Sequence, residues 1–155
     1  MSKQDFRPPP AVVESIKEHA AAVREEAKEL TKRIEQFEAY LATVKGRMDT
    51  THFGRHPDCD PEEDLDLAIR LHRSGKEWVL SWANHNSGYH EEHAMDWQLL
   101  KEAPLKIKIA AVQMFPDFLE EIEKSQIRLA KEIRRATTEF DEFIKKLPLN
   151  EKERE

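Results

Sequence analysis

Residues 11–48 read AVVESIKEHAAAVREEAKELTKRIEQFEAYLATVKGRM, and this stretch decides the fold. Its apolar side chains recur in alternating steps of three and four residues, at Val13, Ile16, Ala20, Val23, Ala27, Leu30, Ile34, Phe37, Leu41, Val44 and Met48. Strict spacing of this kind over five heptads is typical of a coiled-coil helix. The sequence therefore predicts one long helix over residues 11–48.

A second stretch, residues 112–147, carries the same rhythm. It reads VQMFPDFLEEIEKSQIRLAKEIRRATTEFDEFIKKL, with Val112, Phe115, Leu119, Ile122, Gln126, Leu129, Ile133, Ala136, Phe140, Phe143 and Leu147 at the repeating positions. Pro104 suits the first turn of a helix, so we predict a second helix over residues 104–147. Pro116 removes a helical hydrogen bond, and we expect a kink or a break near it.

The segment between the helices has a period of two. Leu65, Leu67, Ile69 and Leu71 alternate with polar or small residues, and a glycine-containing turn at residues 73–76 precedes a second alternating run. This pattern predicts a β-hairpin with one buried face. We assign residues 65–99 to a small β head, in which residues 95–99 form a possible third strand.

The remaining segments are predicted to connect or to end the chain. Residues 1–10 finish in three prolines and are expected to form a mobile arm, and residues 148–155 a frayed charged tail. Residues 49–64 combine several acidic side chains with Gly54, Pro57 and Pro61, which favours an acidic connector over a packed element.

The predicted fold class is α+β and predominantly α. The two ladders are equally long, and the head joins the end of the first to the start of the second. We therefore expect a long antiparallel helical hairpin, a coiled-coil-like stalk, with an antiparallel β head of two or three strands inserted between its helices. Charges beside the seams favour pairing of unlike helices, with Lys17 and Arg24 on the first, and Glu123, Glu132 and Glu139 on the second.

Composition narrows the classes of partner. The net charge of −6 argues against bulk electrostatic binding to nucleic acid or to an anionic membrane. A single cysteine excludes an internal disulfide and suits a reducing compartment. There is no apolar run long enough for a membrane span and no secretion signal, so a cytoplasmic location is expected.

The middle of the chain holds a group of residues that could bind a transition metal. Six of the seven histidines lie there, and the candidate ligands are His52, His56, Cys59, His90 and His93. Zinc and other divalent transition metals accept these donors, and three ligands with a water would suit hydrolysis. Against a metal site, the chain has neither a CxxC pair nor an HExxH motif.

Four further residues are candidates for interaction. Trp78, Trp82 and Trp97 could stack on the bases of single-stranded nucleic acid, but few basic residues accompany them. Tryptophans on a hairpin more often fill the core between sheet and helix. Gln126 occupies a seam position, where it either fixes the pairing register or reaches past the seam to water.

No complete catalytic motif or cofactor-binding loop accompanies these patterns. We therefore predict a non-enzymatic interaction or structural module that self-associates, as a homodimer, or binds a partner protein through its stalk and head. The alternative is a metal-dependent enzyme or metal sensor that uses the His/Cys cluster of residues 52–93. Because two helices alone bury limited apolar surface, a dimer that forms a four-helix bundle is the specific expectation.

Overall fold

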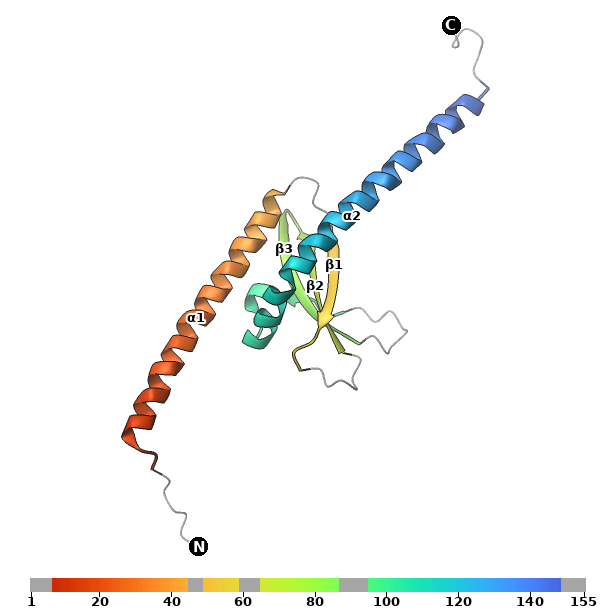
Figure 1. The fold of residues 1–155 in the computed structure, drawn as a ribbon. Helices are drawn as coiled ribbons and strands as arrows, with labels where there is room; N and C mark the ends of the chain where they lie inside the picture. Colours follow the sequence, from red (N-terminus) through yellow and green to blue (C-terminus); the bar gives the residue numbers. More distant parts are fainter. Residues whose placement is uncertain (1–6, 45–48, 59–64, 87–94, 149–155) are drawn as a thin grey trace.

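The computed structural model describes residues 7–44, 49–58, 65–86 and 95–148 of the 155-residue chain. Its elements follow one another as α1 (Pro10–Thr43), β1 (Thr50–Arg55), β2 (Leu65–Ser74), β3 (Glu77–Asn86), β4 (Gln98–Leu99), the short 3-10 helix η1 (Leu100–Glu102) and α2 (Leu105–Lys146) (Figure 1). The predicted class is confirmed: the fold is α+β and mostly helical, with two long helices flanking an antiparallel sheet.

Both helices begin next to prolines. α1 follows Pro9 and has Pro10 in its first turn, and α2 follows Pro104. A proline suits this place because the first amides of a helix have no acceptor within the helix. α2 then continues through Pro116 as one helix, so it does not break there.

The four strands form one antiparallel sheet in the order β1-β2-β3-β4. The predicted hairpin of β2 and β3 is confirmed, and its turn places Gly75 at a φ of 62°. Glycine adopts this left-handed conformation without a steric penalty, as two-residue hairpin turns require. β4 lies within the predicted third strand, and β1 brings the sheet to four strands.

β1 corrects the prediction of an unpacked connector over residues 49–64. Thr50, His52 and Gly54 lie opposite Leu71, Ile69 and Leu67 of β2 and therefore face the same side of the sheet. Helix α2 packs closely there. A Cβ added to Gly54 would lie 2.6 Å from the Met114 methyl carbon.

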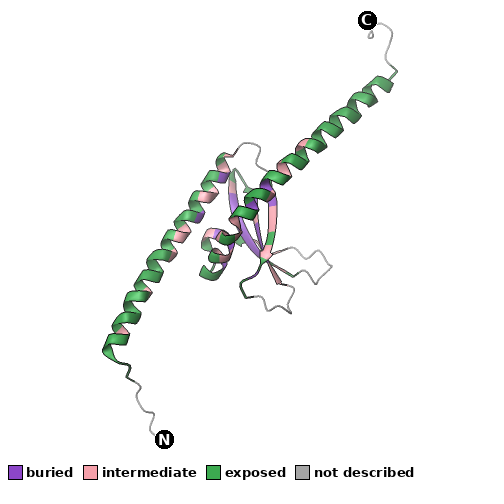
Figure 2. Ribbon diagram, viewed as in Figure 1, coloured by how far each residue is buried: buried purple, intermediate pink, exposed green. Residues whose placement is uncertain are grey.

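The core lies between one face of the sheet and both helices. β2 and β3 contribute the alternating apolar residues that the sequence predicts, and each helix adds only the part that crosses the sheet. The core residues are Ile34 and Leu41 of α1, Leu67, Ile69 and Leu71 of β2, Leu80 and Trp82 of β3, Leu100 and Ala103, and Ile107, Ala111, Phe118 and Ile122 of α2. Figure 2 shows this burial as a central band.

The relative direction of the helices corrects the predicted antiparallel seam. Lys108 Nζ donates a hydrogen bond to Thr31 Oγ1 at 2.8 Å, and the rings of Phe37 and Phe115 stack with centroids 4.1 Å apart. Thr31 comes before Phe37 on α1, and their partners Lys108 and Phe115 come in the same order on α2. Where they touch, α1 and α2 therefore run in the same direction (Figure 1).

Strand number explains this direction. A head of two long strands would return the chain to the end where it entered, and the second helix would then run back along the first. β1 adds a third long strand, so the chain crosses the sheet an odd number of times before α2 begins. The five-heptad seam consequently does not form within one chain.

As a result, each helix extends beyond the sheet, and the two extensions leave it at opposite ends (Figure 1). We call residues 10–29 the α1 overhang and residues 123–146 the α2 overhang. The body comprises the sheet, η1, residues 30–43 of α1 and residues 105–122 of α2. At 1.5 Å per residue the overhangs are roughly 30 and 36 Å long.

Candidate interaction surface

The α1 overhang exposes the first half of the heptad ladder. Ile16 and Val23 lie at seam positions and are 61% and 56% exposed, whereas Ile34, farther along the same face, is fully buried in the body. The overhang has no buried residue (Figure 2). Of its five seam positions, two (20 and 27) are alanines and three are β-branched apolar residues.

The α2 overhang exposes the second half of the other ladder, and its side chains are larger. Ile133, Phe140 and Phe143 are each 57% exposed. The last buried residue of α2 is Ile122, and every residue of the overhang beyond it is half-buried or exposed. An apolar stripe of this length without cover is the usual mark of a binding face on a soluble domain.

A shallow groove lies at the base of the α1 overhang. Its volume is about 300 Å³, and it lies between α1 and the first turns of α2. Its lining is apolar except for one carboxylate and consists of Val23, Glu26, Ala27, Leu30, Leu105 and Ile109. The groove is therefore suited to an apolar side chain from another helix.

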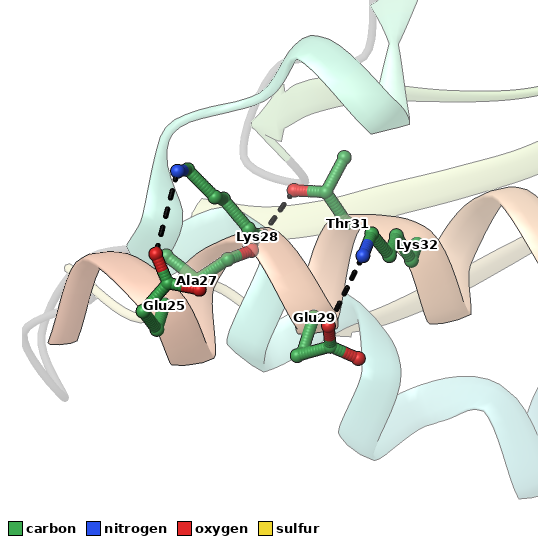
Figure 3. A network of polar contacts seen from close by, with 6 residues as sticks. All are labelled: Glu25, Ala27, Lys28, Glu29, Thr31 and Lys32. Atoms are coloured by element: carbon green, nitrogen blue, oxygen red, sulfur yellow. Dashed lines mark hydrogen bonds and ion pairs between the residues drawn. The ribbon is translucent and has the colours of Figure 1, made fainter. Parts of the chain in front are cut away.

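Several polar side chains of α1 between residues 25 and 32 also form contacts within the helix. Lys28 Nζ lies 3.4 Å from Glu25 Oε1, Lys32 Nζ lies 3.2 Å from Glu29 Oε1, and the Thr31 hydroxyl donates to the Ala27 carbonyl (Figure 3). Exposed pairs of this kind stabilise a helix only by about 0.2–0.5 kcal/mol each. They do not replace cover for the apolar side.

Gln126 marks the start of the α2 overhang. It lies half-buried, four residues beyond Ile122 on the seam face. The seam thus passes from a buried isoleucine to a polar side chain where α2 leaves the body. Its predicted role in register stays a prediction.

Only two of the predicted metal ligands lie within the described residues. His56 is buried, and both its ring nitrogens are used: the Asp58 amide donates to Nδ1 at 3.1 Å, and Nε2 donates to Asn84 Oδ1 at 2.8 Å. His52 faces α2, with its ring 6.4 Å from that of Phe118.

The hydrogen bonds of His56 give it a structural role that leaves no lone pair for a metal. The other three predicted ligands, Cys59, His90 and His93, lie outside the described residues. Among the described residues, no three His, Cys, Asp or Glu side chains gather closely enough to hold a metal ion.

The three tryptophans have different surroundings. Trp82 belongs to the core, and Trp78 packs against the core from the start of β3. Trp97 lies on the other side of the sheet, where the Arg70 guanidinium carbon is 4.2 Å from the centroid of its ring. This distance is typical of a cation–π contact.

Beside Arg70, a polar pair on the same side of the sheet was not foreseen from the sequence. The His72 Nε2 and Ser81 Oγ atoms are 2.7 Å apart, because the two residues lie on adjacent strands and face the same way. Burial and the nearby Arg70 charge lower the pKa of His72, and burial lowers the pKa of Arg70. The alternation of β2 places Arg70 and His72 on one side, but the partner strand register is needed to find Ser81.

Comparison with known proteins adds no relative. No family model, no curated protein and no solved structure matches this chain. Within the described part of the chain, neither long helix has a stretch apolar enough to cross a membrane. The two overhangs and the groove are therefore the features of the chain that bear on its function.

Proposed function

We propose that this protein is an interaction module that binds protein through its helical overhangs, and that the body holds the overhangs in place. The main support is that the apolar side of each helix is exposed where the helix extends beyond the body. Ile16 and Val23 are exposed on α1, and Phe140 and Phe143 are exposed on α2.

Physical chemistry supports a partner for these helices. In proteins most of the stability of a helix comes from the packing of its apolar side rather than from intrinsic helix propensity. The side chains concerned are aliphatic or aromatic. Complete burial of a fully exposed side chain of this kind contributes roughly 1.5–3 kcal/mol, and a little over half of each surface here is still exposed. A protein partner that presents another apolar helix would provide this cover in the ordinary coiled-coil manner.

The sheet is assigned a supporting role in this proposal. Trp82 fills the core and Trp78 packs beside it, so these side chains anchor the helices to the hairpin. The predicted metal chemistry is not part of the proposal, because His56 is fully engaged in hydrogen bonds.

A photo-cross-linking amino acid placed in the full-length protein tests the proposal. Incorporation at Phe140 reports on the apolar side of the α2 overhang, and incorporation at Glu142, on the same helical turn but outside the seam, is the matched control. In the cells that make the protein, irradiation is expected to give protein adducts at position 140 and few at position 142. Adducts at neither position, or equal adducts at both, would contradict the proposed binding face.

A further inference from the structure

We infer that copies of this chain associate head to tail, with the α2 overhang of one copy lying parallel to the α1 overhang of the next. This inference rests on the proposed function and names the partner as another copy of the same chain. Each copy then uses a different overhang at each of its ends. The contact is therefore heterologous, and the assembly is an open chain of copies instead of a closed dimer.

The direction of the two helices permits this arrangement. α1 and α2 run in the same direction where they touch, and their overhangs leave the body at opposite ends (Figure 1). A second copy that is shifted along the helices, without being turned round, therefore places its α1 overhang beside the α2 overhang of the first copy. The two overhangs then run parallel, as α1 and α2 already do within the body.

Charged residues beside the seams favour the parallel direction and fix its register. If the seam residues occupy heptad positions a and d, Lys17 and Arg24 follow a d position and are at e, whereas Glu132 and Glu139 precede an a position and are at g. In a parallel pair, the g position of one helix faces the e position of the following heptad of the other. One register therefore pairs Glu132 with Lys17 and Glu139 with Arg24 at the same time.

An antiparallel pair lacks this match. In that direction e positions face e positions, and g positions face g positions. The two basic residues of α1 would face the uncharged e positions 130, 137 and 144 of α2. Glu26, at a g position of α1, would face g positions of α2, two of which are Glu132 and Glu139. The flanking charges thus select the parallel direction.

The sizes of the seam residues are complementary in the same parallel register. It places Val13, Ile16, Ala20, Val23 and Ala27 beside Ile133, Ala136, Phe140, Phe143 and Leu147, in that order. Each alanine in these two sets faces a larger side chain, and cores pack well when large residues lie opposite small ones. Because exposed ion pairs contribute little, these apolar layers are expected to provide most of the affinity.

The place where α2 ends fits this register too. Leu147 caps the C-terminus of α2 and would lie beside Ala27, which lines the groove between α1 and the first turns of α2. A register one heptad closer to the body would bring Phe143 beside Leu30, where α2 of the same copy begins at Leu105. A register one heptad farther out would lose the ion pair of Glu132. The charges, the side-chain sizes and the end of α2 therefore agree on one register.

Substitutions at the facing pair of Ala20 and Phe140 test the contact in the full-length protein. Ala20→Glu places a carboxylate where the Phe140 ring is expected, and Phe140→Glu replaces the ring itself. The wild type is expected to grow beyond two copies as its concentration rises to about 100 μM. Each variant alone is expected to stay a single copy, with a dissociation constant raised more than about tenfold, because association would bury an unpaired charge.

An equimolar mixture of the two variants distinguishes head-to-tail pairing from the other pairings. The Phe140→Glu variant keeps an intact α1 overhang, and the Ala20→Glu variant keeps an intact α2 overhang, so together they form one wild-type contact. Their other overhangs are blocked, and growth is expected to stop at one copy of each. Ala21→Glu and Thr138→Glu add the same charge at exposed positions outside the seam and are expected to leave the constant within about twofold of the wild type.

Sedimentation equilibrium measures the masses and constants, and circular dichroism checks that each variant keeps its helices. Association of the Phe140→Glu variant alone would mean that α1 overhangs pair with each other, and association of the Ala20→Glu variant alone would mean that α2 overhangs do. Either result, a mixture that does not associate, or a wild type that stops at one or two copies would overturn the inference. Protein cross-links from position 140 would then still leave the proposed function standing, and their absence would remove both.

Discussion

The two halves of helix α1 carry the same heptad pattern in different surroundings. Ile34 and Leu41 in the second half are buried against the sheet, whereas Ile16 and Val23 in the first half are more than half exposed. α2 repeats the contrast in the opposite order, with buried Phe118 before exposed Phe140. Heptad spacing therefore predicts that one side of a helix is to be covered, but not which chain covers it.

The largest difference between body and overhang is expected in the free energy of unfolding when one phenylalanine in each is replaced by alanine. Phe118→Ala removes a fully buried ring and should lower the free energy of unfolding by about 3–5 kcal/mol. Phe140→Ala removes a ring that is 57% exposed in the single chain, and should lower it by less than about 1 kcal/mol at protein concentrations too low for association. Urea unfolding followed by circular dichroism measures both. Equal losses would mean that the overhang is part of the same core as the body.

A smaller effect is expected where α1 meets the sheet. A carboxylate oxygen of Glu38 accepts a hydrogen bond from the Leu80 amide at 2.8 Å, and the other lies 3.9 Å from Lys101 Nζ. Glu38→Ala would leave the part-buried amide without its acceptor and should cost about 1–3 kcal/mol in unfolding free energy. Glu35→Ala, one turn earlier and exposed, is the control and should change stability by less than about 0.5 kcal/mol. If the two variants were equally stable, the contact between α1 and β3 would carry no energy.

The smallest expected effect is a pH dependence of folding stability that comes from His72, a residue of the body. Burial and the Arg70 charge hold the pKa of His72 below its ordinary value in the folded chain. The unfolded state therefore binds a proton first as the pH falls below about 7, and stability decreases with falling pH. His72→Gln should remove this contribution, so the stability advantage of the wild type should shrink between pH 7.5 and pH 5.5. A difference between wild type and variant that does not change over this range would show that His72 titrates alike in both states.

The sequence was sufficient for every element with strong periodicity. The 3-4 ladders located both helices, and the alternation from Leu65 to Leu71 located the central hairpin. β1 was missed because its core-facing positions are Thr50, His52 and Gly54, none of which is a large apolar residue. α2 packs so closely over Gly54 that no larger side chain fits without a shift of Met114. The two adjacent threonines and Phe53 were the available β signal.

The candidate surface could be predicted in part. The seam residues and their flanking charges are visible in the sequence, but their exposure depends on the direction of the helices. Adding one strand to the sheet reverses the direction of α2 relative to α1, and β1 is that additional strand. The groove beside Leu30 and Ile109 also depends on this packing, because its two walls come from helices about 75 residues apart in the chain.

Hydrogen–deuterium exchange at two protein concentrations tests the central claim most directly, namely that the body folds alone while the overhangs need a second chain. We predict that amides of β2, β3 and residues 105–122 stay protected at both concentrations. Amides of residues 10–29 and 123–146 should be protected at about 100 μM and should lose that protection together on dilution below the dissociation constant. Protection of the overhangs that does not change with dilution, or that is absent at every concentration, would contradict the account.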